Sequence, residues 1–181
     1  PVRGYVDTHT HITSYEFMGG KMMHGKPFHR WGVEEALSDS SIVHGPNGSL
    51  DLIGNLYAYN DINKRYDTRG WPDFPWWPNR QQLSHSGYYY KWIERAYLSG
   101  LRLMVTDIVE NEVLCKAQST INPGSWVNPN SCDTMESIRL QIQRLYEMQD
   151  YIDAQSGGPS KGFFRIVTSP EQARSVIANG Q

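Results

Sequence analysis

The sequence predicts an α/β fold, namely the N-terminal part of a (β/α)8 barrel of the TIM type with a long aromatic-rich loop after its first strand. Helical and strand-like segments alternate along the chain, which is typical of α/β proteins. The second strand-like segment is almost continuously apolar, which indicates a parallel sheet covered on both faces. The chain has 181 residues, and such a barrel needs at least about 200. We therefore expect residues 1–181 to form the first portion of a single barrel.

The first expected strand covers residues 4–7 and ends in polar residues. Residues 13–86 show no sustained periodicity, except for short helices expected over 33–37 and after Asp51, whose side chain can cap a helix. This stretch carries most of the tryptophans of the chain. Because long loops inside compact domains are often functional, we predict that residues 13–86 form an insertion over the mouth of the barrel.

Regular structure is expected again after residue 86. Asp133 and Glu136 form a capping box, and Ser169 followed by Pro170 is typical of a helix start. Gly100 stands where the glycine after a helix belongs. The expected elements are a helix over 87–99, a strand over 101–109, a helix from 133 to about 156, a strand over 163–167 and a helix from 169 to 180.

Charge, hydropathy and cysteines restrict the classes of function. Lysine and arginine number 17 and aspartate and glutamate 19, which gives a net charge of −2 and argues against a nucleic-acid partner. No run of about 18 apolar residues is present, so no membrane span is expected. Cys115 and Cys132 enclose an expected loop that is rich in Asn, Pro, Gly and Ser. We expect a disulfide and a secreted, extracellular protein, with two free thiols as the alternative.

The stretch from Asp7 to His11 carries the strongest chemical signal. Residues i and i+2 of a strand point to the same face, so His9 and His11 should project together, with Asp7 lining the same side. Neutral imidazole nitrogens suit zinc, and active sites of barrels lie at the C-terminal ends of strands. We predict that His9 and His11 bind one or two divalent ions, zinc being expected; surface histidines near a turn are the alternative. Asp107 and Glu110 either orient these histidines or are ordinary charges at a strand end.

Other residues are candidates for lining the same site. His24 lies in a glycine-rich stretch after the first strand, and His85 precedes the helix that leads to the second strand. Both can turn toward the mouth of a barrel, although a structural, hydrogen-bonded role is the competing interpretation for every histidine outside the pair. Trp76 and Trp77 belong to a stiff segment of tryptophans and prolines. This segment is expected to plug the top of the barrel, to wall the substrate pocket, or both.

The segment Val6-Asp7-Thr8-His9-Thr10-His11 resembles the His-x-His motif at the end of the first strand of amidohydrolase-superfamily barrels. Residues 92–105 and 164–180 are similar to membrane-dipeptidase-like members of that group, including uncharacterised bacterial proteins. The resemblance implies a hydrolase whose metal-activated water attacks an amide, an ester or a related bond of a small-molecule or peptide-like substrate. It also implies that the remaining ligands and the general base lie in the C-terminal remainder of the same precursor, so activity would require that remainder as a partner.

Two alternative functions remain open at this stage. Phosphoesterases of the polymerase-and-histidinol-phosphatase type also begin with Asp-x-His-x-His, but no cluster of lysine and arginine lies near the motif here. The second alternative is a non-enzymatic carbohydrate-binding or surface module on a degenerate barrel, which the 6 tryptophans and 11 tyrosines favour. Further metal ligands in the remainder of the precursor would favour the enzyme hypotheses over the non-enzymatic binding module.

Overall fold

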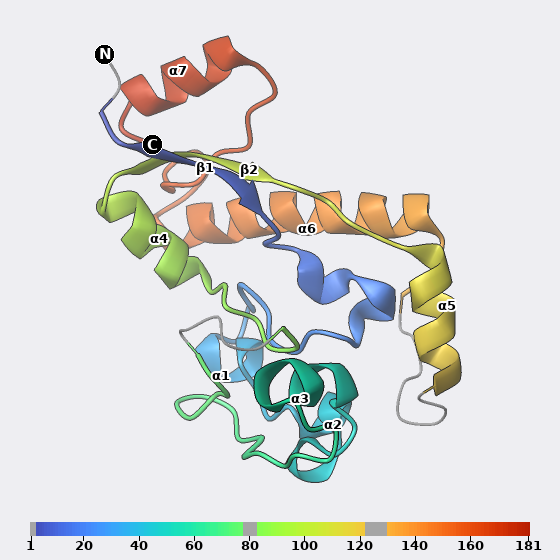
Figure 1. Ribbon diagram of the computed structural model, residues 1–181. Helices are drawn as coiled ribbons and strands as arrows, with labels where there is room; N and C mark the ends of the chain where they lie inside the picture. The colour runs from blue at the N-terminus through green and yellow to red at the C-terminus, as the bar shows by residue number, and fades with distance from the viewer. Residues whose placement is uncertain (1–2, 78–82, 122–129) are drawn as a thin grey trace.

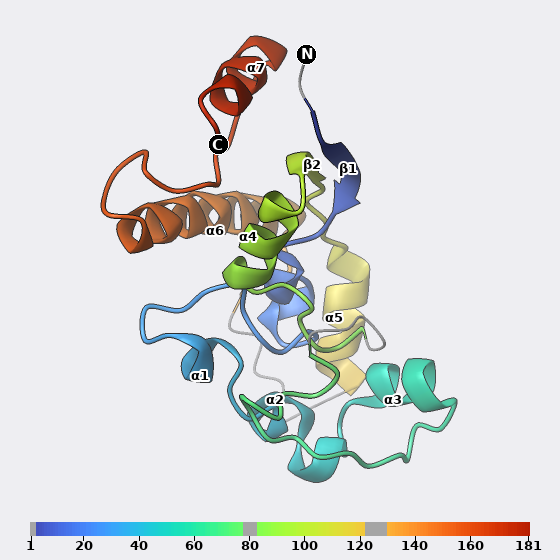
Figure 2. The same cartoon turned by 90° about the vertical axis from the view of Figure 1, so that its left-hand side faces the viewer.

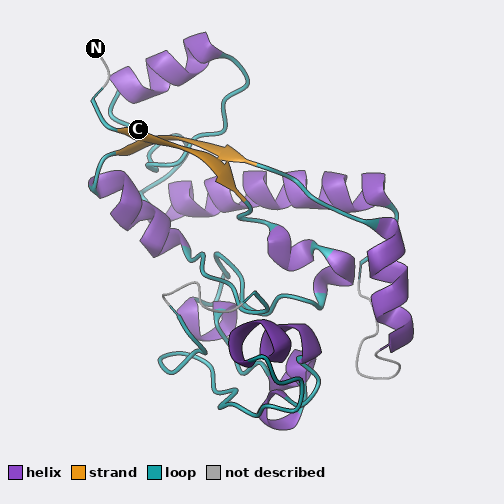
Figure 3. Ribbon diagram, in the orientation of Figure 1, coloured by secondary structure: helices purple, strands orange, loops and turns teal. Residues whose placement is uncertain are grey.

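The structure is a computed structural model that describes residues 3–77, 83–121 and 130–181. Its only sheet within these residues consists of two parallel strands, β1 (Tyr5–Thr10) and β2 (Leu101–Thr106) (Figure 1). Helices account for most of the remaining regular structure (Figure 3). The predicted mixed α/β class and the predicted parallel pairing are confirmed.

Strand β1 lies open to solvent, whereas β2 is mostly half-buried. The first five residues of β1 are exposed, and only Thr10 at its end is buried. The Thr10 hydroxyl donates to the carbonyl oxygen of Val105 at 2.9 Å, which holds the C-terminal ends of the two strands together. Val6 remains 53% exposed, although strands of parallel sheets are usually buried on both faces.

Helix α4 (Tyr90–Leu98) leads into β2 through a tight turn, as predicted. Gly100 adopts a φ of +109°, a conformation that side chains with a Cβ atom rarely adopt. Its carbonyl oxygen accepts the backbone N–H of Tyr5 at 2.9 Å. The glycine therefore both ends the helix and begins the pairing of β1 with β2.

The segment 13–86 contains short helices rather than one continuous loop. Helices α1 (Val33–Ala36) and α3 (Leu52–Tyr59) were expected, and Asp51 caps α3 by accepting the backbone N–H of Gly54 at 3.0 Å. Helices α1, α2 (Ser41–His44) and α3 lie at one end of the molecule, and α7 (Pro170–Ala178) lies at the other end (Figures 1 and 2). The elements are η1 (Ser14–Glu16), η2 (Met18–Gly20), α1 (Val33–Ala36), α2 (Ser41–His44), η3 (Pro46–Gly48) and α3 (Leu52–Tyr59).

Two of the helices after β2 begin at the predicted caps, and one was not predicted. Helix α6 (Thr134–Gln155) is capped by Asp133, and α7 (Pro170–Ala178) by Ser169. Helix α5 (Glu112–Ile121) occupies part of the stretch that the sequence assigned to a loop. The Asn111 side chain accepts the backbone N–H of Leu114 at 2.9 Å and so supplies a cap for α5. The rest of that expected loop, residues 122–129, lies outside the described residues.

The predicted strand over residues 163–167 is wrong, because these residues join no ladder within the described part of the chain. Helix α6 binds their polar groups instead. The backbone N–H of Ile166 donates to the Gln149 side chain at 2.8 Å, and the Arg165 guanidinium binds Asp153. The segment is thus fixed to α6 rather than to the edge of β2.

The hydrophobic core joins the segment 13–86 to α4 and α6. Ile12, which follows the predicted metal-binding motif, is 1% exposed, so the core holds the chain where β1 ends. Burial of such apolar side chains is the main source of stability. The buried members of the core are Ile12, Ala36, Leu37, Phe74, Tyr89, Tyr90, Ile93, Met148 and Ile152. No helix in the described part of the chain combines the length and the apolar character needed to cross a bilayer.

The predicted disulfide between Cys115 and Cys132 is present. It connects α5 to the segment just before α6, across a sequence separation of 17 residues. Such a bond fits an oxidising compartment. Loop-closure entropy predicts that reduction lowers the free energy of unfolding by about 3 kcal/mol.

Denaturant unfolding of the oxidised and the reduced protein measures this effect. The double variant Cys115→Ala/Cys132→Ala should unfold like the reduced protein, which separates the covalent link from the side chains themselves. Equal stability of the oxidised and reduced forms would refute the prediction.

Candidate metal centres

His9 and His11 lie side by side at the C-terminal end of β1. Their rings meet edge to face with centroids 4.7 Å apart, and the two Nε2 atoms are 3.0 Å apart. This is the arrangement expected for residues i and i+2 of one strand. The His9 side chain is 73% exposed, so solvent reaches the pair freely.

Asp107, the first residue after β2, contacts the other nitrogen of both rings. Nδ1 of His9 lies 3.3 Å from a carboxylate oxygen of Asp107, and Nδ1 of His11 donates to the Asp107 carbonyl oxygen at 3.0 Å. Because a carbonyl oxygen only accepts, Nδ1 of His11 carries a proton, and Nε2 of the same ring faces Nε2 of His9. Metal-binding histidines usually donate their second ring N–H in this way.

The two other acidic candidates near this centre bind backbone groups. The Asp7 carboxylate accepts the backbone N–H of His9 at 3.2 Å, so it supports the motif. The Glu110 carboxylate accepts the backbone N–H of Met18 at 3.1 Å and the hydroxyl of Ser137 at 2.7 Å. Glu110 thus ties η2 to α6.

His24 and His85 meet each other within the segment 13–86. They form an isolated parallel bridge, in which the backbone N–H of Ser86 donates to the His24 carbonyl oxygen at 2.8 Å. Both rings flank His44, with centroid distances of 4.7 Å from His85 and 6.2 Å from His24. The Trp76 ring lies 5.5 Å from His85 and covers this group of histidines.

Trp77 belongs to a different aromatic group. Its ring packs against Trp71 at 5.1 Å and against Trp92 of α4 at 5.2 Å. It also lies against the hydrophobic core. The two neighbouring tryptophans therefore support different parts of the molecule.

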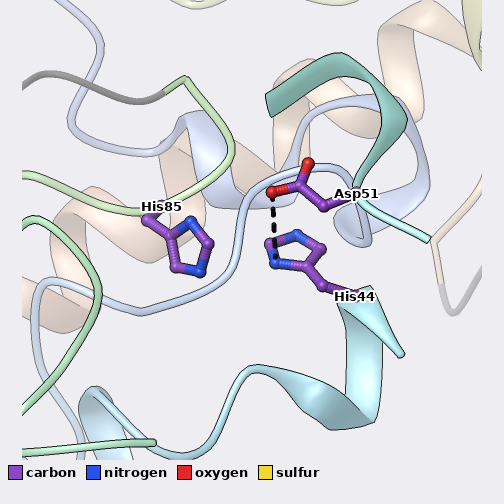
Figure 4. A group of neighbouring side chains, drawn as sticks. All are labelled: His44, Asp51 and His85. Atoms are coloured by element: carbon purple, nitrogen blue, oxygen red, sulfur yellow. Dashed lines mark ion pairs between the residues drawn. The ribbon is translucent and has the colours of Figure 1, made fainter. Parts of the chain in front are cut away.

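A second possible metal centre, the buried triad, consists of His44, Asp51 and His85 (Figure 4). One ligand atom from each residue lies within 4.8 Å of the other two, so the group can hold a metal ion. Nδ1 of His44 lies 3.8 Å from a carboxylate oxygen of Asp51. The Tyr66 hydroxyl lies 3.0 Å from that nitrogen and 2.8 Å from that oxygen. All three members of the triad are buried.

Burial sets the protonation of the histidines in this region. Loss of hydration lowers the pKa of His24 to about 4. It also lowers the pKa of His44, against the opposing effect of Asp51, and places the pKa of His85 well below its ordinary value. Burial and the Asp51 charge raise the pKa of Tyr66. The imidazoles are therefore neutral at pH 7, which is the form that binds metals.

The two centres differ in what they can do chemically. The pair at the end of β1 is open to solvent, as a catalytic metal site must be, whereas the buried triad resembles a closed structural site. His44 and Asp51 were not predicted to share a site. For Asp51 the sequence signal was its capping role, which concerns its other carboxylate oxygen, and His85 was predicted to line the site on the first strand.

Comparison of the chain with protein-family models, with curated protein sequences and with solved structures finds no match. The geometry of the two centres therefore provides the functional argument.

Proposed function

We propose that the protein is a metal-dependent hydrolase in which Nε2 of His9 and Nε2 of His11 bind a divalent metal ion, zinc in the first instance. The observation that carries this proposal is the 3.0 Å approach of the two Nε2 atoms, with Nδ1 of His11 donating to the Asp107 carbonyl oxygen. A divalent ion bound by both nitrogens can replace this direct contact between the rings. Imidazole nitrogen is a preferred zinc ligand.

The position of the pair suits hydrolysis. A divalent ion lowers the pKa of a bound water to about 7 and so provides hydroxide near neutral pH. His9 and His11 would supply two of its ligands, and their exposure leaves room for water and substrate. The proposed substrate is a small or peptide-like molecule with an amide, ester or related bond.

The open sheet supports the proposal that residues 3–181 belong to a (β/α)8 barrel. Tyr5, Val6 and Val105 are exposed on the two strands, and parallel sheets seldom leave such residues in solvent. Asp107 and the histidine pair lie at the C-terminal end of the sheet, where barrel enzymes place their active sites. We propose that the other strands and metal ligands come from the remainder of the same precursor, and that this precursor is secreted.

The double variant His9→Ala/His11→Ala tests the metal site. We expect the full-length protein with these substitutions to lose one equivalent of bound metal by elemental analysis, together with its hydrolytic activity. His29→Ala is the matched control, because His29 lies outside both centres, and it should keep the metal content of the unmodified protein. Undiminished metal in a folded double variant would exclude the proposal.

A further inference from the structure

We infer that the buried triad of His44, Asp51 and His85 binds a second divalent ion, of the zinc type, whose role is to hold the segment 13–86 in its fold. This site is separate from the pair on β1. Its residues come from the C-terminal end of α2, from the N-cap of α3 and from the segment before α4 (Figure 4). A metal bound by all three would crosslink the end of α2, the start of α3 and the segment before α4.

The need for such a crosslink follows from the local structure. Helices α1 and α2 have four residues each, and α3 has eight. Helices of this length are unstable by themselves in water. The His24–His85 bridge is an isolated pair rather than a ladder. A metal ion that links three such stretches contributes its binding energy directly to folding.

The orientation of His44 is that of a metal ligand. Its Nε2 donates to the carbonyl oxygen of Met22 at 3.3 Å, which leaves the lone pair on Nδ1. An Asp51 carboxylate oxygen lies 3.8 Å from Nδ1, and the Tyr66 hydroxyl lies 3.0 Å from Nδ1 and donates to that oxygen, so a polar group already links the two atoms that an ion would join. Metal-bound histidines typically donate their second N–H to a backbone carbonyl in this manner.

The surroundings of the triad favour a closed site with nitrogen and oxygen ligands. The exposed fractions of His44, Asp51 and His85 are 0%, 3% and 5%. The Tyr66 hydroxyl, which contacts both His44 and Asp51, supplies a fourth polar atom beside them. Two neutral imidazoles with one carboxylate match the ligands that zinc accepts, whereas calcium and magnesium prefer oxygen alone.

Cobalt titration of the His9→Ala/His11→Ala variant tests this site without the pair on β1. The chelator-treated variant should bind one equivalent of Co²⁺, with the visible absorption bands of a four-coordinate nitrogen and oxygen site. At about 100-fold excess over the dissociation constant, we expect the Tm to rise by about 5–10 °C. A folded variant that binds no cobalt and shows no rise in Tm would overturn the inference.

Further substitution identifies the ligands. Adding His85→Gln to that variant should abolish the absorption bands and the rise in Tm, and adding His44→Gln should do the same. Adding His29→Gln should change neither. Cobalt binding that survives both substitutions in the triad would show that the ion binds elsewhere and would overturn the inference. If these variants fail to fold, the cobalt stoichiometry and Tm of the parent variant still decide the outcome. A result against this site would leave the test of the His9–His11 pair unaffected.

Discussion

Replacing Asp153 with alanine is expected to lower the free energy of unfolding by about 3–5 kcal/mol, which is the usual cost of removing one partner of a buried ion pair. The Asp153 carboxylate binds the Arg165 guanidinium through both of its oxygens. It also accepts the backbone N–H groups of Ser160 and Gly162, each at 2.8 Å. The variant would leave a largely buried arginine and two backbone donors without their acceptor.

Urea unfolding measures this effect, and Asp150→Ala is its control. Asp150 lies on the same helix, α6, but is exposed, so its replacement should change the free energy of unfolding by less than about 0.5 kcal/mol. If both variants lose the same stability, the ion pair is not responsible.

Acid should weaken the same interaction. Although burial opposes ionisation, the Arg165 contacts and the two backbone N–H groups lower the pKa of Asp153 from 3.8 to about 2. The stabilisation is therefore complete above about pH 4 and is lost as the pH falls through about 2. The stability difference between the unmodified protein and Asp153→Ala should shrink over this interval, and a constant difference would contradict the assignment.

Leu37→Ala is expected to produce a loss of similar size, about 2–5 kcal/mol, through the cavity it creates in the core. Leu37 is 0% exposed and is a member of the hydrophobic core that joins the segment 13–86 to α4 and α6. The denaturation midpoint should fall without a change in the denaturant slope if the variant keeps its fold.

Leu98→Ala is the matched control for the core substitution. Leu98 ends α4 and is 74% exposed, so the same chemical change removes almost no buried surface there. A stability loss at residue 98 equal to that at residue 37 would show that the core assignment is wrong.

The elements with local signals could be predicted from the sequence. Asp51, Asp133 and Ser169 bind the N-termini of their helices with their own side chains, and Gly100 ends α4 in a conformation that favours glycine. The strand over residues 163–167 failed because a strand depends on a partner, and these residues bind α6 instead. Helix α5 was missed because the polar residues after it indicated a loop.

The two candidate metal centres also differ in whether local sequence signals could predict them. His9 and His11 are two residues apart on a strand, so periodicity alone placed them together. His44 and His85 are 41 residues apart and lie in a segment without periodicity, and their approach depends on the fold of the whole segment. Local spacing gives no information on such a pair, which is why only the structure places it beside Asp51.

The side chain of Gln141 on α6 connects the segments that follow β1 and β2. Its amide nitrogen donates to the Val109 carbonyl oxygen at 2.7 Å, and its amide oxygen accepts the Thr13 hydroxyl at 3.4 Å. Val109 follows β2 and Thr13 follows β1, so one side chain binds the segments after both strands. Thr13 and Gln141 are 128 residues apart, and contacts of such separation form late and slow folding. On the ribosome, β1 leaves the exit tunnel long before α6. The segment after the histidines at the end of β1 therefore gains its contact with Gln141 only after α6 has been synthesised.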